Sequence, residues 1–586
     1  MNLKPIVVKE YLESLTEKSE LNTIFPILLE AMNFTVLSKP AQKLGLKEYG
    51  KDIVAIGDDD DGIKKRFYFE LKGGGDRNIT ESGLRKKDGV YESLIESTFE
   101  DFVSAYPRFQ HLPLKIVIVH NGEAKGNVQS TLDSLFTKLS TARPNTTYDR
   151  WDISRLTILF SEHLFGAHLL TDAKSTSLFN RVLINLNSTQ GISPHFNELL
   201  DYIFTKHTWT GYKKTIQRKW RLLFESLKLI AFVIYTESEK INNLDIAKRY
   251  STYLIIRFWY WILKNKLEKD EKVLQYFTQV LIHFVHVLQL YLKRTYHTSR
   301  IKNGLSSKKG GRYEQVGFNL RSFDYFHYLL LVIRIETEVL GEANTKGVVS
   351  VINELISNNM VLCRPMLDIH SIPIMQALNA QMKCGDYENA KTYLRNIFWY
   401  LKRGKEMYDC LPDANNSKEN VVRLASSGEK TIFYSDSTSP ILAALLEYTV
   451  ILNMEEEYNE IRDFILDKEV DLGLFVPFHG ASSESQGFIE DQDNDLEEQL
   501  FSKSVDDGYQ SEIRITKDLH EPLSFEGFIE RFNDRKQEFS YEYRTESVGY
   551  GFLLDLAHYY FQTPFFPDKW RSLSIHQLEE SETAVK

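Results

Sequence analysis

The sequence predicts an α/β domain at the amino terminus, followed by a large region built almost entirely of helices. Up to about residue 190, short runs of β-branched and aromatic residues alternate with helical patterns. From about residue 193, long helical periodicities with large aromatic side chains replace them. A chain of 586 residues exceeds one ordinary hydrophobic core. We therefore expect between two and four domains.

The elements of the amino-terminal domain follow from residue spacing. Apolar residues at helical spacing predict helices, and compact apolar runs between polar turns predict buried strands. The predicted order describes an α/β sandwich with a mixed sheet. Its elements are a helix over residues 20–30, hairpin strands over 50–56 and 66–72, a helix over 89–102, a strand over 114–119, a helix over 126–139, a strand over 155–160 and a helix over 161–170.

The hairpin places charged residues on one face. Its two strands flank the polar turn Asp58-Asp59-Asp60-Asp61-Gly62, a hairpin signal. With the turn centred near Asp61, Asp52 lies opposite Glu70. Because side chains alternate along a strand, Asp52, Glu70 and Lys72 share one face, and Phe67, Phe69 and Leu71 point to the other.

These charges predict a metal site. Two adjacent carboxylates repel each other, and a divalent cation removes the conflict. Mg²⁺ prefers oxygen ligands and is often held by one or two carboxylates together with substrate phosphates. We therefore expect Asp52 and Glu70 to bind Mg²⁺, or Mn²⁺ in its place. Lys72 would hold or activate the attacking water and stabilise charge on the phosphate.

Asp52 followed by a strand that ends in Glu70-Leu71-Lys72 resembles the PD-(D/E)XK signature of restriction-endonuclease-like nucleases, nearest to the Mrr-like enzymes. The resemblance covers roughly residues 1–190. It implies an αβββαβ core and metal-dependent hydrolysis of DNA, with RNA as an alternative substrate. It also implies a further acid from the preceding helix. Glu20 is our choice and Glu30 the alternative, because Asn22 stands where the Mrr-like register has glutamate.

The residues after the hairpin have two interpretations each. Gly73 and Gly74, in a run of three glycines, either form a flexible turn or let a nucleic-acid backbone come close. The basic residues that follow either contact phosphates or belong to a solvated loop. They are Arg77, Arg85, Lys86 and Lys87. His120 and Asn121 are either a strand-end turn or catalytic.

The rest of the chain divides into three parts. Residues 193–480 predict an α-helical array, similar to tetratricopeptide repeats where Ser371-Ile372-Pro373 and Ser439-Pro440 each start a helix. Residues 481–522 include a stretch rich in acidic residues and predict a linker or loop. Residues 523–586 predict a C-terminal helical part.

Composition limits where the protein acts. A formal net charge of −10 means that DNA contacts must come from local basic patches. The three cysteines have no spacing typical of a zinc site or disulfide framework. Residues 273–292 lack formal charge but contain Gln and His, which favours a buried helix over a membrane span. Without a secretory signal, we expect a cytoplasmic protein that has no membrane partner.

We expect an endonuclease joined to a helical sensing or assembly region, an arrangement similar to that of bacterial anti-phage effectors. The helical region would bind a protein partner or activator, and the sequence leaves homo-oligomer formation open. The alternative is a catalytically inactive nuclease fold that acts as a scaffold or nucleic-acid-binding protein through its helices. A third interpretation, an exposed hairpin with ordinary surface charges, leaves no site at all.

Overall fold

The computed structural model describes residues 4–39, 50–86, 89–126, 128–187, 191–206, 213–307, 311, 313–339, 345–475, 512–514, 519, 524–538, 544–562 and 569–572. The chain forms two compact units. Unit 1 comprises Met1–Leu254 with Tyr276–His283, and unit 2 comprises Ile255–Gln275 with Phe284–Lys586.

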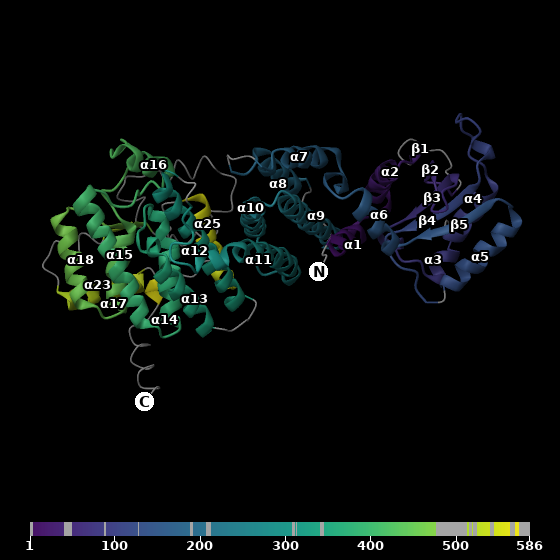
Figure 1. Cartoon of the computed structure of the whole chain (residues 1–586). Helices are drawn as coiled ribbons and strands as arrows, with labels where there is room; N and C mark the ends of the chain where they lie inside the picture. Colours follow the sequence, from purple (N-terminus) through teal and green to yellow (C-terminus); the bar gives the residue numbers. More distant parts are fainter. Residues whose placement is uncertain are drawn as a thin grey trace, which may run out of the picture. The chain divides into compact units, whose positions relative to one another are not determined.

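Unit 1 is built around a five-stranded mixed sheet (Figure 1). Its strands follow sequence order: β1 (Thr35–Ser38), β2 (Ile53–Asp58), β3 (Lys64–Lys72), β4 (Leu114–His120) and β5 (Thr146–Trp151). β1, β2 and β3 pair antiparallel, whereas β3, β4 and β5 pair parallel. The predicted α/β domain with a mixed sheet is confirmed.

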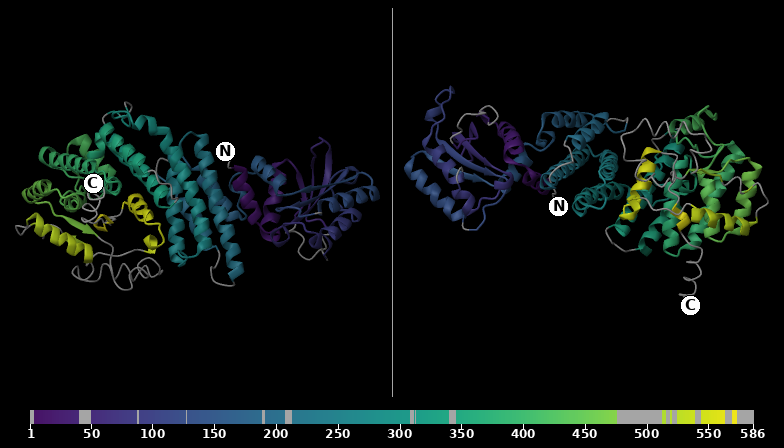
Figure 2. Two further views of the ribbon diagram at one scale, coloured as in Figure 1. Left: turned by 90° about the horizontal axis from the view of Figure 1, so that it is seen from below. Right: turned by 180° about the vertical axis from the view of Figure 1, so that it is seen from behind.

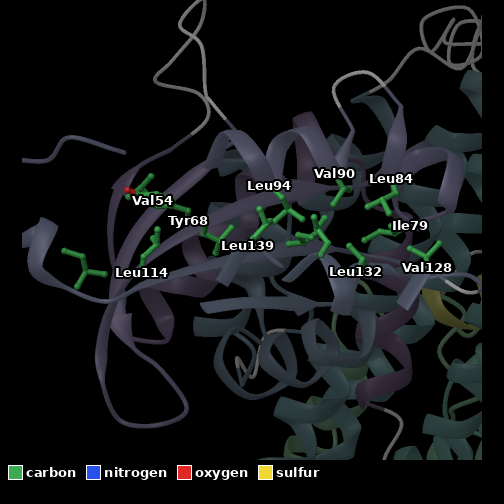
Figure 3. Packing of buried hydrophobic residues seen from close by; sticks show 14 of the residues in the cluster. Val54, Tyr68, Ile79, Leu84, Val90, Leu94, Leu114, Val128, Leu132 and Leu139 are labelled. Carbon is green, nitrogen blue, oxygen red and sulfur yellow. The ribbon is translucent and has the colours of Figure 1, made fainter. Parts of the chain in front are cut away.

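The two faces of the sheet carry different cores, and helices cover both (Figure 2). On one face, an aromatic cluster joins Phe25 of α2 to Phe67, Phe69 and Trp151 of the strands, with Phe34 beside it. On the other face, Val54 and Tyr68 pack against Leu94 of α4 (Val90–Phe99) and Leu132 of α5 (Val128–Ala142) (Figure 3). This division follows the alternation of side chains along β3.

Helices and short turns complete the α/β part of unit 1. The predicted strand over 155–160 and helix over 161–170 are wrong. The strand is β5, earlier in the chain, and residues 155–160 belong to the helix α6 (Ile153–His163). Asp152 caps α6 by accepting hydrogen bonds from the backbone N–H groups of Ser154 and Arg155. The buried residues Ile153, Leu156 and Phe160 then repeat at helical spacing. The elements are α1 (Lys4–Ser14), η1 (Glu17–Leu21), α2 (Asn22–Ala31), η3 (Gly74–Asp76), α3 (Glu81–Arg85), α4 (Val90–Phe99), η4 (Phe109–His111), α5 (Val128–Ala142), α6 (Ile153–His163) and η5 (Ala167–Leu169).

The remaining chain is largely helical, as predicted. Unit 1 adds α7 (Ala173–Ile184), α8 (Pro194–Thr205) and α9 (Lys213–Lys240), and α10 (Leu244–Lys264) and α11 (Glu271–Ser299) contribute residues to both units. The other elements of unit 2 are α12 (Glu314–Glu338), α13 (Thr345–Asn358), η7 (Met360–Cys363), η8 (Asp368–His370), α14 (Ser371–Lys383), α15 (Tyr387–Tyr408), α16 (Lys418–Ser427), α17 (Pro440–Ile451), α18 (Glu455–Asp467), β6 (Gly473–Phe475), β7 (Glu512–Arg514), α23 (Phe525–Glu538), α24 (Arg544–Ser547), α25 (Phe552–Phe561) and η9 (Lys569–Ser572).

Two helix pairs occupy the region predicted to be repeat-like. α14 and α15 form the first pair, and α17 and α18 form the second. Ser439 starts α17 as predicted, because its hydroxyl oxygen accepts a hydrogen bond from the Leu442 N–H at 3.2 Å. The acidic run within residues 481–511 lies outside the described residues.

By length and composition alone, α11 is long and apolar enough to cross a membrane, a test that core helices also pass. Two of its polar side chains bond to charged residues of other helices. Gln279 accepts a hydrogen bond from Lys228 at 3.0 Å, and Gln289 donates one to Glu336 at 2.6 Å. These hydrogen bonds join α11 to α9 and to α12, and the buried helix expected from the sequence stays a prediction.

Candidate active site

The hairpin register places Asp52 and Glu70 across from each other. Ile53, the first residue of β2, pairs with Phe69 in the antiparallel ladder, so extending this register by one residue brings Asp52, directly before β2, across from Glu70. The Asp52 N–H continues the ladder with a 3.0 Å hydrogen bond to the Phe69 carbonyl oxygen. Val54 and Tyr68 point to the α4 and α5 side. Glu70 and Lys72 of β3 alternate onto that same side as Tyr68.

Lys72 and Glu70 are in direct contact at the end of β3. The Lys72 Nζ lies 2.6 Å from the Glu70 Oε1, and the two side chains are 13% and 8% exposed. The Ser93 hydroxyl of α4 donates a second hydrogen bond, of 2.8 Å, to the same oxygen. Ser93 comes this close because Gly50 has no side chain. A Cβ at Gly50 would meet the Ser93 carbonyl oxygen at 2.1 Å.

Asp52, directly before β2, contributes a second carboxylate. Its Oδ2 accepts a hydrogen bond of 2.6 Å from the Leu71 N–H, between the two charged residues of β3. The Asp52 charge also acts on the Lys72 ammonium. Burial opposes the charged form of Lys72, but Glu70, Glu17 and Asp52 outweigh it and raise the pKa of Lys72 above its ordinary value.

The third carboxylate is Glu17, which sequence reasoning missed. It belongs to η1, a single π-helical turn in which the Leu21 N–H bonds the Thr16 carbonyl oxygen at 2.8 Å. The Glu17 Oε2 accepts a 3.3 Å hydrogen bond from the Gly73 N–H, directly after Lys72. Burial raises the pKa of Glu17, and the Lys72 charge opposes this only in part.

The acids chosen from the sequence lie elsewhere in this segment. The Glu20 carboxylate accepts hydrogen bonds from the Thr16 N–H, at 2.5 Å, and from the Thr16 hydroxyl. Glu30 is exposed and pairs with Lys39 at 2.6 Å. Asn22 begins α2, with its side-chain oxygen buried. Glu17 is thus the acid of this segment that meets β3, and metal binding by Glu20 stays a prediction.

The glycines after β3 accommodate η1. A Cβ on Gly73 would lie 2.8 Å from the Glu17 nitrogen, and one on Gly74 would lie 3.3 Å from the Thr16 methyl carbon. Gly75 has open space around it. Close approach of a protein backbone therefore accounts for Gly73, and approach of nucleic acid to Gly73 and Gly74 stays a prediction.

The basic residues after the glycines have protein partners. Arg77 donates a 2.7 Å hydrogen bond to the Glu13 carbonyl oxygen of α1. Lys86 pairs with Asp76 at 2.8 Å, and Arg85 lies 3.9 Å from Glu81. Lys87 lies outside the described residues. Arg85 and Lys86 are exposed, so both remain accessible to a phosphate backbone.

His120 and Asn121 are buried at the end of β4. The His120 Nδ1 lies 2.9 Å from the Arg77 carbonyl oxygen, which can only accept, so Nδ1 carries the hydrogen. Burial lowers the pKa of His120. Asn121 donates hydrogen bonds to the carbonyl oxygens of Leu12 and Leu15, at 2.7 and 2.9 Å. These contacts fix the sheet edge against α1, which is a structural role.

The donor chemistry fits a hard cation. The carboxylate oxygens of Asp52, Glu70 and Glu17 are the ligand type that Mg²⁺ and Mn²⁺ prefer. Glu70 uses only Oε1 for Lys72 and Ser93, which leaves Oε2 for a metal. Within the described ranges, however, no group of three or more His, Cys, Asp and Glu side chains is arranged to hold a metal ion. The carboxylates are arranged around Lys72 instead.

Comparison with known proteins finds no matching family model, no matching curated protein and no matching solved structure. The function proposed below is therefore argued from the geometry of this site.

Proposed function

We propose that the protein is a metal-dependent endonuclease that hydrolyses DNA phosphodiester bonds. One observation carries the proposal: Lys72 pairs with Glu70 at 2.6 Å, and the carboxylates of Asp52 and Glu17 accept hydrogen bonds from the backbone N–H groups on either side of Lys72, those of Leu71 and Gly73. The three acids come from separate parts of the chain: Glu17 lies in η1, Glu70 in β3 and Asp52 directly before β2. Carboxylates that bind metal, next to a lysine that serves the water, are the parts that phosphodiester hydrolysis needs.

Each residue has a defined task in this proposal. Asp52 and Glu70 would hold Mg²⁺ or Mn²⁺, and Glu17 would approach the same ion from η1. When bound, the cation would neutralise charge on the phosphate and activate a water molecule. Lys72 would hold that water in position and stabilise the negative charge that builds on the phosphate oxygens. Arg85 and Lys86 would contact phosphates on either side of the cut.

The chain order around the site supports the resemblance to PD-(D/E)XK nucleases. α2, then β1, β2 and β3, then the helices before β4 give the helix–strand–strand–strand–helix–strand order of that core. The large helical region supports the further proposal of a bacterial anti-phage effector with a sensing or assembly part. That second step is an analogy of architecture.

The test is cleavage of supercoiled plasmid with Mg²⁺ or Mn²⁺, and with EDTA as the metal-free control. Glu70→Ala and Lys72→Ala should each lower the rate by about 100-fold or more. Lys65→Ala is the matched control, because Lys65 is a buried, ion-paired lysine at the other end of β3. Intact plasmid with every metal and DNA form, or full activity in Glu70→Ala, would refute the proposal.

A nuclease fold that binds nucleic acid without cutting is the second candidate. It is favoured by the direct contact of Lys72 with Glu70, in place of a three-acid metal cluster among the described residues. Calorimetric titration with Mg²⁺ separates the two candidates. With a hydrolysis-resistant DNA duplex present, a nuclease should bind the metal and lose binding in Glu70→Ala, whereas an inactive scaffold should show no metal binding that depends on Glu70.

A further inference from the structure

In the structure, Lys72 occupies the position beside the Glu70 carboxylate that a metal ion would need. The ammonium lies 2.6 Å from the Glu70 Oε1, and both side chains are largely shielded from water. Glu17 and Asp52 act on the same ammonium. An ion pair at this separation and burial is much stronger than one on an exposed surface. Lys72 therefore already neutralises part of the negative charge that would attract a cation.

A divalent metal must compete with Lys72 for these carboxylates. If the ammonium stays in place, the metal enters beside a positive charge that repels it. If the ammonium leaves, Glu70 loses its ion-pair partner. Ser93 does not remove this competition, because its hydroxyl bonds the same Glu70 oxygen and holds the carboxylate beside Lys72. Both routes weaken metal binding to the protein alone.

We propose that Lys72 is an internal counter-cation that keeps the carboxylate site closed, and that a nucleic-acid phosphate opens it by drawing the ammonium away from Glu70. This inference rests on the proposed function and adds its regulation. A phosphate offers Lys72 an alternative anion at the edge of the site. The released Glu70 can then bind the metal, so nucleic acid and metal strengthen each other's binding.

This coupling is reciprocal by thermodynamic linkage. Nucleic acid should raise the affinity for the metal by the same factor by which the metal raises the affinity for nucleic acid. The protein alone would bind metal weakly, and metal would enter mainly when substrate is present. Lys72 would then have two tasks. Before substrate binds it would pair with Glu70 and weaken metal binding, and afterwards it would position the attacking water.

Metal affinity without catalysis tests the inference. Isothermal titration calorimetry of the full chain with Mg²⁺ would compare wild type, Lys72→Met, Lys72→Arg and Lys65→Met. Lys72→Met keeps the length of the side chain but removes its charge, so it should bind Mg²⁺ about tenfold more tightly or better. Lys72→Arg keeps the charge and should bind as weakly as wild type. Lys65→Met changes a buried lysine of the same strand and should have no effect on metal affinity.

A second titration includes a short phosphorothioate duplex, which resists hydrolysis. The duplex should tighten Mg²⁺ binding to wild type by about tenfold and leave Lys72→Met nearly unchanged. Circular dichroism would establish that each variant is folded. If wild type binds Mg²⁺ through Glu70 but Lys72→Met does not bind it more tightly, this inference is overturned and the proposed function stands. If neither binds Mg²⁺ with or without the duplex, both fail.

Discussion

Replacing Gly73 by alanine should push η1 away from the end of β3. The new Cβ would lie 2.8 Å from the Glu17 nitrogen, closer than real Cβ contacts allow, and 3.1 Å from the Glu17 Cα, which is also tight. Gly73 has an extended backbone, with φ −151° and ψ 176°, so alanine adds no backbone strain of its own. The cost comes from overpacking alone, about 1–3 kcal/mol. Gly75→Ala is the matched control, because a Cβ at Gly75 meets no atom within 4 Å.

Hydrogen exchange of the full chain measures this effect locally. In Gly73→Ala, peptides that cover η1 should exchange about 5- to 150-fold faster, which is the population change expected for 1–3 kcal/mol. Mg²⁺ affinity should fall as well, because Glu17 moves away from Lys72. Gly75→Ala should match wild type within about 0.5 kcal/mol. If both variants exchange and bind metal alike, close packing of η1 is not why the chain has glycine at position 73.

Three other substitutions test buried charges. Glu17→Gln should stabilise unit 1 at neutral pH and weaken Mg²⁺ binding. Burial raises the pKa of Glu17, so the folded protein favours the protonated form, which glutamine resembles. The difference in melting temperature between the variant and wild type should therefore close toward about pH 4. Asp368→Asn should behave the same way in unit 2 thermal melts, because burial and then Asp413 raise the pKa of Asp368 well above its ordinary value. Glu447→Gln should lower the unfolding free energy by about 3–5 kcal/mol in calorimetric scans, since it leaves the buried guanidinium groups of Arg535 and Arg571 without their carboxylate. Equal melting temperatures across pH, or an unchanged scan, would contradict these expectations.

The hairpin and its charged face could be predicted because their geometry is local. In the turn between β2 and β3, the Asp59 N–H donates a hydrogen bond to the Ile63 carbonyl oxygen. Gly62 in this turn has a φ of 73°, which favours glycine. Once the turn is centred, strand alternation determines which side chains oppose each other. The expectation that Asp52, Glu70 and Lys72 lie close together therefore needed no knowledge of the rest of the fold.

Glu17 and α6 were missed because long-range or capping contacts determine them. An α-helical spacing from residue 20 onward gave no reason to choose Glu17, whose position depends on a π-helical turn packed against Gly73. The run Arg155 to Phe160 is rich in apolar and β-branched residues, so it is typical of a strand as well as a helix. Asp152, a residue type that often caps the start of a helix, was the signal that could have favoured a helix over a strand for this run.

Residues read from the sequence as candidates for chemistry also contact the segment that carries the third acid. Asn121 bonds two carbonyl oxygens near the end of α1, and Arg77 bonds the Glu13 carbonyl oxygen in the same helix. Gly73 then admits the start of η1 and donates its N–H to Glu17. All of these contacts act on the junction between α1 and η1. A carboxylate whose protonated form is favoured by burial needs such support to stay beside Lys72 when it is ionised, so the strand ends supply both the charges of the site and the means of positioning them.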